Sequence, residues 1–299
     1  MSTPAVLTLG ETMVMLTPAG SEPLQTAATL DVYVGGAESN VASWLAGAGV
    51  ASAWASRVGD DPLGRRLVAE VAGHGVDVSH VTTDPGATTG VYFKDPRPEG
   101  TRVHYYRRGS AASLMDADLV DDLPFDGLRL LHLTGITPGL SASCARLVEA
   151  ALARARAVGA LVSFDVNYRA GVWPVAVAAP RLRALADRAD VVLVGLDEAA
   201  VLWGAATPAD VRTLLPGPAR VVVKDGAVGA TELGAEGPVS VPAHRVEVLE
   251  PVGAGDAFAA GYLGALLRDR PAAAALQEGH DLAALALVST TDVPRRRPT

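Results

Sequence analysis

Short apolar runs alternate along most of this chain with longer segments of helical periodicity. Runs of Val, Leu and Ala that end at Gly or Asp are typical of buried strands, and longer runs with a polar stripe are typical of amphipathic helices. The pattern predicts strands at residues 5–9, 51–57, 128–133, 161–164, 191–194 and 220–223. It predicts helices at residues 39–48, 62–74, 141–158, 254–267 and 272–287. Strands that alternate with helices indicate an α/β fold with a mostly parallel sheet that is covered on both faces.

Two regions, residues 11–34 and 89–108, do not follow this alternation. They lack helical periodicity and contain strand-like runs separated by Pro and Gly, and the second is consistent with a hairpin around residues 95–100. We interpret both regions as a small β sheet that is inserted into the α/β body as a lid over a ligand site. Two ordinary surface hairpins are the alternative. The whole chain, residues 1–299, then forms one domain with a short tail at 293–299.

Composition and charge narrow the class of protein. The 299 residues are 49% hydrophobic, which is enough to bury a large core and argues against a disordered chain. The net charge of −8 argues against non-specific binding to nucleic acid, and we interpret the three arginines at 295–297 as a solvated end. No apolar run approaches the roughly 18 residues that span a bilayer, and the first residues lack the features of a signal peptide. We therefore expect a cytoplasmic protein.

Cysteine and lysine are scarce. Cys144 is the only cysteine, so the chain has no intrachain disulfide and no multi-cysteine metal site, and we expect this thiol to be buried in a helix. The only lysines are Lys94 and Lys224, and neither belongs to a Gly-Lys-Ser/Thr phosphate loop. Schiff-base chemistry would have to use one of them, so a keto-acid lyase that acts through Lys224 is one alternative function.

The segment Gly253-Ala254-Gly255-Asp256, which leads into an apolar helix, is the strongest chemical signal in the sequence. Glycines at a helix start let the backbone approach a ligand and expose N–H groups, which together with the helix dipole favour a phosphate. A carboxylate is unfavourable beside an anion, so we infer a chemical role: Asp256 would take a proton from a hydroxyl that attacks the phosphate. The alternative is a Gly-rich loop in which Asp256 only caps the helix.

Two further segments place polar groups where a ligand could bind. The pair Gly35-Gly36 opens a helix that carries Asn40, so backbone N–H groups and the amide could contact the hydroxyls of a polyol. A plain helix start made of small residues is the alternative. Arg169 follows a strand at its carboxyl end, where open α/β sheets bind ligands. Its guanidinium suits a carboxylate or a phosphate, and a surface ion pair is the alternative.

Tyrosine and arginine alternate near residue 106. On a strand, Tyr105 and Arg107 share one face, where a ring and a guanidinium together would suit a small anionic sugar. Residues of these types are also common at the solvated edges of sheets, which is the alternative here.

Two loops after strands carry candidate nucleotide and metal ligands. The Gly-rich segment from Lys224 through Gly226 to Gly229 is either a nucleotide-binding loop or a hairpin turn. Asp197 and Glu198 could hold Mg²⁺ through water, because this ion prefers one or two carboxylates together with phosphates and water. Acidic residues that cap a helix are the alternative.

The order of these segments resembles that of the ribokinase-like (PfkB) family of sugar kinases over nearly the whole chain. The resemblance implies a three-layer αβα sandwich with a small β-sheet lid, and ATP and Mg²⁺ as cofactors. It implies an anion hole made by the N–H groups of Gly253, Ala254 and Gly255, with Asp256 as the general base. It also implies nucleotide contacts from Asn167, Lys224, Gly226 and Gly229, and Mg²⁺ held through water by Glu198 and Asp197.

Within this family the sequence is most similar to 2-keto-3-deoxygluconate kinases, through residues 35–38, 90–92, 105–113 and 165–169. This resemblance implies transfer of the γ-phosphoryl group of ATP to a primary hydroxyl of that acid sugar or a close relative. The arginines would lie nearest the sugar carboxylate. The implied substrate contacts are Gly35, Gly36, Asn40, Tyr92, Tyr105, Arg107, Arg169 and Asp292.

The sequence departs from the family pattern at three places. Glu250 lies ahead of the Gly-Ala-Gly-Asp signature where Asp is common, which puts a monovalent-cation site in doubt. Gly195 replaces the Asn of an Asn-x-x-Glu motif that ends at Glu198. His280 and Asp281 lie where an Asn near the adenine is usual, so the nucleotide preference is open as well.

Two further functions are alternatives: a fructokinase- or ribokinase-like kinase of a neutral sugar, and a sugar or nucleotide sensor without catalysis. A neutral sugar would leave the guanidiniums of Arg107 and Arg169 without a carboxylate, which favours an acid sugar. The expected partners are therefore ATP and a small acid sugar, with no nucleic acid and no membrane. An exposed edge of the lid sheet also favours a homodimer formed through the lid.

Overall fold

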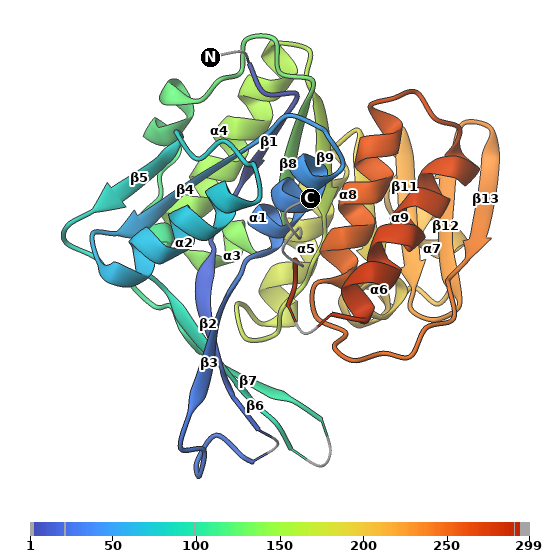
Figure 1. Ribbon diagram of the computed structural model, residues 1–299. Coiled ribbons are helices and arrows are strands. Elements are labelled where there is room, and N and C mark those ends of the chain that lie inside the picture. Colours follow the sequence, from blue (N-terminus) through green and yellow to red (C-terminus); the bar gives the residue numbers. More distant parts are fainter. Residues whose placement is uncertain (1–2, 21, 98–99, 290, 294–299) are drawn as a thin grey trace.

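A large sheet forms the centre of the molecule (Figure 1). The computed structural model describes residues 3–20, 22–97, 100–289 and 291–293. In these residues the strand order is β13-β12-β11-β10-β9-β8-β1-β4-β5, with antiparallel pairing only among β11, β12 and β13. The strands are β1 (Val6–Leu9), β4 (Ser52–Gly59), β5 (Val81–Asp84), β8 (Leu130–Thr134), β9 (Leu161–Asp165), β10 (Val191–Gly195), β11 (Arg220–Asp225), β12 (Gly229–Gly234) and β13 (Gly237–Pro242). The prediction of an α/β fold with a mostly parallel sheet is confirmed.

Helices cover both faces of this sheet, because successive strand residues point to opposite sides. In β1, Val6 packs against one helical layer and Leu7 against the other. One layer consists of α1 (Ala37–Gly47), α8 (Ala254–Leu266) and α9 (Ala272–Leu287), with α2 (Pro62–Gly73) beside α1. The other consists of α4 (Ala142–Ala157), α5 (Val175–Ala186), α6 (Leu196–Trp203) and α7 (Pro208–Leu214), with α3 (Thr137–Leu140) next to α4. The expected three-layer arrangement is therefore present.

Most predicted elements agree with the observed ones to within a few residues. Helix α4 begins at Ala142, one residue later than expected, because the Ser141 hydroxyl accepts a hydrogen bond from the Cys144 backbone N–H at 3.1 Å and so caps the helix. Cys144 is buried in this helix, as predicted. Helices α5, α6 and α7 and strands β5 and β13 lie outside the predictions. Helix α5 contains Pro180, and the other two helices have only 8 and 7 residues, too few for a clear period.

A second sheet, termed the small sheet, projects away from the three layers (Figure 1). Its strand order is β3-β2-β6-β7, with β2 and β6 parallel and the other pairs antiparallel. The strands are β2 (Met13–Pro18), β3 (Leu30–Gly35), β6 (Val91–Asp95) and β7 (Arg102–Tyr106). After β7 the chain returns to the body through two short 3₁₀ helices, η1 (Ala111–Leu114) and η2 (Ala117–Asp122). The two irregular regions of the sequence thus pair with each other in one sheet.

The predicted tail at residues 293–299, including the arginines at 295–297, lies outside the described residues except for Val293. Val293 packs at the margin of the layer formed by α1, α8 and α9. In the part of the chain that the structure describes, no helix has the length and apolar character needed to cross a membrane.

Candidate active site

A cleft of about 710 Å³ lies between the small sheet and the carboxyl ends of the central strands. Its walls come from the small sheet, from the segments that follow β8 to β11, and from the start of α8. All the expected substrate contacts line it: Gly35, Gly36, Asn40, Tyr92, Tyr105, Arg107, Arg169 and Asp292. Eight other candidates line it too: Asn167, Asp197, Glu198, Lys224, Gly226, Gly253, Gly255 and Asp256. Ala254 and Gly229 lie outside this lining.

Helix α8 begins at the cleft with an open turn. Its N-cap is Gly253, whose φ of +86° is a left-handed conformation that suits glycine, and a Cβ there would lie 3.0 Å from the Cβ of Asp292. No described side chain caps this helix start, so the first backbone N–H groups are available to an anion. The alternative of Asp256 as the N-cap is wrong, because Asp256 lies within the first helical turn.

The carboxylate of Asp256 is held by Asn40 of helix α1. The Asn40 amide nitrogen donates to Oδ2 of Asp256 at 2.8 Å and to Oδ2 of Asp292 at 3.2 Å. Burial, reinforced by the negative charge of Asp292, raises the pKa of Asp256 to about 7, although the hydrogen bond from Asn40 acts in the opposite direction. Burial also raises the pKa of Asp292. A carboxylate that gains and loses its proton near neutral pH has the property that a general base requires.

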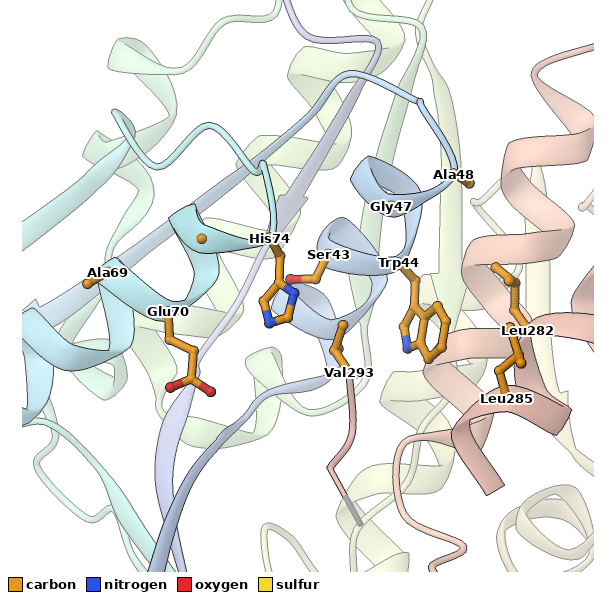
Figure 2. A pocket seen from close by; sticks show the side chains of 11 residues that line it. Ser43, Trp44, Gly47, Ala48, Ala69, Glu70, His74, Leu282, Leu285 and Val293 are labelled. Atoms are coloured by element: carbon orange, nitrogen blue, oxygen red, sulfur yellow. The ribbon is translucent and has the colours of Figure 1, made fainter. Parts of the chain in front are cut away.

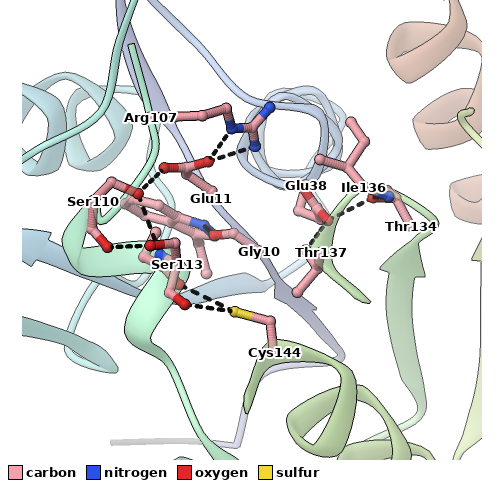
Figure 3. A network of polar contacts seen from close by, with 12 residues as sticks. Gly10, Glu11, Glu38, Arg107, Ser110, Ser113, Thr134, Ile136, Thr137 and Cys144 are labelled. Atoms are coloured by element: carbon pink, nitrogen blue, oxygen red, sulfur yellow. Dashed lines mark hydrogen bonds and ion pairs between the residues drawn. The ribbon is translucent and has the colours of Figure 1, made fainter. Parts of the chain in front are cut away.

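Both arginines that were expected to meet a sugar carboxylate already face carboxylates of the protein. The Nε of Arg107 donates to Oε2 of the buried Glu11 at 2.7 Å, and Nη2 pairs with the same oxygen (Figure 3). Nη1 of Arg169 lies 3.7 Å from Oε1 of Glu198. The expectation that a neutral sugar would leave both guanidiniums without a carboxylate is therefore wrong, since the protein supplies the acids itself.

Lys224 lies near the end of β11 in an ion pair with Asp165, with Nζ 2.8 Å from Oδ2. Burial alone would lower the pKa of Lys224, but the charges of Asp165 and Glu198 outweigh burial and raise it. A Schiff base requires a neutral amine. The surroundings of Lys224 therefore argue against the keto-acid lyase.

The Gly-rich segment after Lys224 forms the turn of a hairpin, because β11 pairs antiparallel with β12. Gly226, with a φ of +48°, lines the cleft, so the turn reaches the ligand site. Gly229 is buried in the ladder, where a Cβ would lie 2.3 Å from the carbonyl oxygen of Val241. This glycine therefore allows close packing of β12 on β13, and the two interpretations of the segment are compatible.

Asp197, Glu198 and Asn167 gather at the ends of β9 and β10. Oε2 of Glu198 accepts a hydrogen bond from the backbone N–H of Gly195 at 3.0 Å, which is the helix-capping arrangement given as the alternative. Asp197 is exposed, and Oδ1 of the buried Asn167 has no hydrogen-bond partner among the described residues. Those residues contain no group of three or more His, Cys, Asp or Glu side chains that could hold a metal ion. A Mg²⁺ ion bound mainly by phosphate and water needs only one or two carboxylates, and Asp197 and Glu198 fit that requirement.

The sequence pattern of the pfkB family carbohydrate kinases matches residues 3–293. The chain belongs to this family. It is similar to a 2-dehydro-3-deoxygluconokinase of Thermoproteus tenax, with 38% identity over 271 residues that cover 88% of this chain and 81% of that protein. A 2-dehydro-3-deoxygluconokinase of Bacillus subtilis (strain 168) is 35% identical over 294 residues, which cover 96% and 90%. The crystal structure of a PfkB protein from Polaromonas sp. JS666 has a TM-score of 0.89 and 37% identity, and the match covers 97% of this chain and 98% of that one.

Sequence reasoning missed several residues that line the cleft of this sugar kinase. Two of them are charged, Glu11 and Lys94. Lys94 is buried in β6, and its Nζ lies 2.7 Å from Oε2 of Glu250, whose Oε1 accepts a hydrogen bond from the backbone N–H of Val252 at 3.1 Å. A lone charge in a strand-like run was the only available signal. The remaining missed residues are Met13, Ala37, Val103, Ile136, Gly195, Pro251 and Val252.

His280 and Asp281, which lie where the family resemblance places an Asn, both contact other residues of the kinase. The buried His280 packs edge-on against the ring of Phe258, with 5.1 Å between ring centroids, and Nε2 lies 3.1 Å from a backbone carbonyl oxygen. Asp281 lies on the surface, with Oδ1 2.7 Å from Nε2 of His244. Neither His280 nor Asp281 lines the cleft.

A second cavity, of about 560 Å³, lies outside the cleft among helices α1, α2 and α9 (Figure 2). Its apolar lining includes Trp44, Leu282 and Leu285. Trp44 connects this cavity to the cleft, because its Nε1–H donates to the carbonyl oxygen of Asp292 at 3.1 Å. The indole therefore fixes the backbone that carries one of the two carboxylates bound by Asn40.

Proposed function

We propose that this kinase transfers the γ-phosphoryl group of ATP to a primary hydroxyl of 2-keto-3-deoxygluconate or a closely related acid sugar, with Asp256 as the general base. The observation that carries the proposal is the placement of Asp256, an uncapped helix start and two arginines in one cleft. The similarity to the relatives from T. tenax and B. subtilis supports the same substrate class.

Asp256 would remove the proton of the attacking hydroxyl. With a pKa of about 7, this carboxylate is partly ionised at neutral pH and is still basic enough to take the proton as the new bond forms. Asn40 orients the carboxylate, and the backbone N–H groups at the start of α8 stabilise negative charge on the transferred group. When bound, Mg²⁺ held through water by Asp197 and Glu198 would neutralise charge on the phosphates.

The small sheet would cover the sugar. The rings of Tyr92 and Tyr105 lie side by side on its cleft face, with 5.7 Å between centroids, and could pack against the carbons of a sugar. Tyr105 and Arg107 share this face as the strand period predicts, whereas Tyr106 is 68% exposed. Closure of the small sheet over the cleft would exclude water and so limit hydrolysis of ATP.

The variant Asp256→Asn tests the role of the base. We expect kcat to fall by about 10²- to 10⁴-fold, the usual contribution of general base catalysis. Calorimetry should show that ATP and the sugar still bind. Asp60→Asn is the matched control, because the exposed side chain of Asp60 pairs, among the described residues, only with the exposed Arg65. An unchanged kcat in Asp256→Asn would overturn the assignment of the base.

A kinase of a neutral sugar is the second candidate, and the ion pair between Arg107 and Glu11 favours it. A coupled ATP-consumption screen across keto-deoxy acids, ketoses and aldoses separates the two. The most informative pair is 2-keto-3-deoxygluconate and 3-deoxyfructose, which differ only in the replacement of the carboxylate by a hydroxymethyl group. A larger kcat/KM for 3-deoxyfructose would favour the neutral sugar. Binding of sugar and ATP without turnover would instead indicate a sensor.

A further inference from the structure

Arg107 enters the cleft with its charge already matched. Nε and Nη2 both pair with Oε2 of Glu11, and Nη1 has no hydrogen bond or ion pair with the described residues, so it is available to a ligand. The ring of Tyr105 lies 5.5 Å from Cζ of Arg107 and covers one side of the guanidinium. Only 12% of the Arg107 side chain is exposed. Arg107 therefore presents a hydrogen-bond donor to the cleft, while Glu11 balances its charge.

The acid that neutralises Arg107 is enclosed by the fold. Glu11 lies between β1 and β2, where the chain passes from the large sheet to the small sheet, and its side chain is fully buried. Oε1 of Glu11 accepts a hydrogen bond from the hydroxyl of Ser110 at 2.5 Å (Figure 3). A Cβ at Gly90 would lie 2.8 Å from the same oxygen, so the glycine leaves the room that this carboxylate occupies. Removing either partner of such a buried pair leaves an uncompensated charge, so the two groups hold each other in place.

Arg169 differs from Arg107 in burial and in pairing. Its side chain is 48% exposed, and the 3.7 Å from its Nη1 to Glu198 exceeds a hydrogen bond. Its Nη1 donates instead to the carbonyl oxygen of Tyr168 at 3.2 Å. Among the described residues, the other cations of the cleft have an acid oxygen within 2.8 Å: Lys94, Arg107 and Lys224. Arg169 is thus the least compensated cation of the described cleft lining.

We propose that the two arginines divide the recognition of the sugar. Arg169 carries the charge that selects an acid sugar. Glu11 is a positioning residue: it balances the charge of Arg107 and holds this guanidinium as a hydrogen-bond donor to a hydroxyl or keto oxygen. This inference rests on the proposed function, because it requires a sugar carboxylate in the cleft. Its physical basis is charge balance. A sugar carboxylate gains little from a guanidinium that a buried carboxylate already neutralises, whereas a half-exposed guanidinium without a hydrogen bond to an acid attracts it more strongly.

Two substrates and three variants test this division. The ratio of kcat/KM for 2-keto-3-deoxygluconate to kcat/KM for 3-deoxyfructose isolates the contribution of the carboxylate, because the rest of the two molecules is the same. The variants are Arg169→Gln, Arg107→Gln and Glu11→Gln, each of which removes one charge and keeps a polar side chain. The KM for ATP and the thermal midpoint of each variant show whether the rest of the enzyme is intact.

The three variants should move the ratio in different directions. In Arg169→Gln we expect the acid-to-neutral ratio to fall by about 10²-fold, which is the loss of one charge-assisted hydrogen bond. In Arg107→Gln, kcat/KM should fall for both sugars together, so that the ratio stays within about threefold of wild type. In Glu11→Gln the ratio should rise by about tenfold, because the charge of Arg107 is no longer compensated. If Glu11 had a purely structural role, Glu11→Gln would lower kcat/KM for both sugars alike and leave the ratio unchanged.

Two results would overturn the division of labour: a collapse of the ratio in Arg107→Gln as large as in Arg169→Gln, or an unchanged ratio in Glu11→Gln. A ratio below one in the wild-type enzyme is a separate result. It would overturn the proposed function, and the inference about the arginines would fall as well. If Glu11→Gln does not fold, the two arginine variants still decide which guanidinium selects the acid. Ser110→Ala, which removes only the hydroxyl donor to Glu11, then tests the positioning role through the same ratio.

Discussion

The pH dependence of the reaction should respond to Asp292. The carboxylates of Asp256 and Asp292 share the amide of Asn40, and the charge of Asp292 helps to raise the pKa of Asp256 to about 7. A general base must be ionised, so kcat/KM should rise with pH through about 7 and level off above it. The variant Asp292→Asn keeps the size of the side chain and removes its charge. We therefore expect a lower pKa for Asp256 and an acidic limb that moves to lower pH.

The distances set the scale of this effect. Hydrogen bonds of 2.8 and 3.2 Å to one nitrogen place the two carboxylate oxygens no more than about 6 Å apart. At that separation and an effective dielectric constant of about 20, two full charges repel by at least about 3 kcal/mol, which corresponds to about two pH units. Burial raises the pKa of Asp292 as well. Solvent in the cleft screens part of the repulsion, so we expect the limb to move by about one pH unit.

A coupled ATP-consumption assay between pH 5 and pH 9 at saturating ATP measures the limb, with Asp60→Asn as the matched control. The pH at the midpoint of the limb tests the interaction of the two carboxylates. The plateau value of kcat/KM does not, because Asp292 also lines the cleft and the variant can change KM. A limb at the wild-type pH would show that the two carboxylates do not interact. A limb that moves to higher pH would refute the electrostatic reasoning.

Three further outcomes follow from the same site. Lys94→Met leaves Glu250 uncompensated ahead of α8, so we expect kcat to fall by about tenfold and the double variant with Glu250→Gln to recover part of the loss, as a double-mutant cycle would show. Gly253→Ala should lower kcat and the thermal midpoint, since a left-handed φ costs about 1–2 kcal/mol and the new Cβ would meet Asp292. Asp256→Asn should be more stable than wild type by an amount that grows from pH 4 to pH 7 and reaches about 1–2 kcal/mol after allowance for solvent in the cleft. The raised pKa means that ionising Asp256 costs more in the folded protein than in the unfolded chain, so wild type loses stability as the pH rises through this range. Unfolding curves of variant and wild type at pH 4 and pH 8 measure this difference, and a variant that is less stable than wild type at pH 8 would show that the sign is wrong.

The central part of the fold could be predicted because its strands are buried on both faces. The run at Val191–Gly195 is continuous and apolar, and helices α4, α8 and α9 are long enough to show a period. Elements at the margins have no such signature. Strand β13 alternates between half-buried and exposed residues and contains two prolines, and β5 is a short polar edge strand. Helix α7 has 7 residues, fewer than two full turns of the pattern that identifies a helix.

The location of the site could be predicted, and its pairings could not. Motifs that end parallel strands gather at one edge of a sheet, so the candidates were expected to meet, and most of them line one cleft. Ion pairs leave no comparable mark on the sequence. Glu11 and Arg107 are 96 residues apart, and Lys94 and Glu250 are 156 apart. Nothing near an isolated acid shows which distant base will neutralise it, so the charge balance of the cleft appears only in three dimensions.

The two hydrogen bonds of Asn40 join parts of the site that are synthesised at different times. Asn40 is 216 residues from Asp256 and 252 residues from Asp292. During synthesis the small sheet and both arginines are therefore complete before the first turn of α8 exists. Under the proposed mechanism that turn brings both the base and the phosphate-binding backbone. A growing chain that ends before residue 254 would therefore carry much of its sugar-facing wall but would lack both the base and the phosphate-binding backbone.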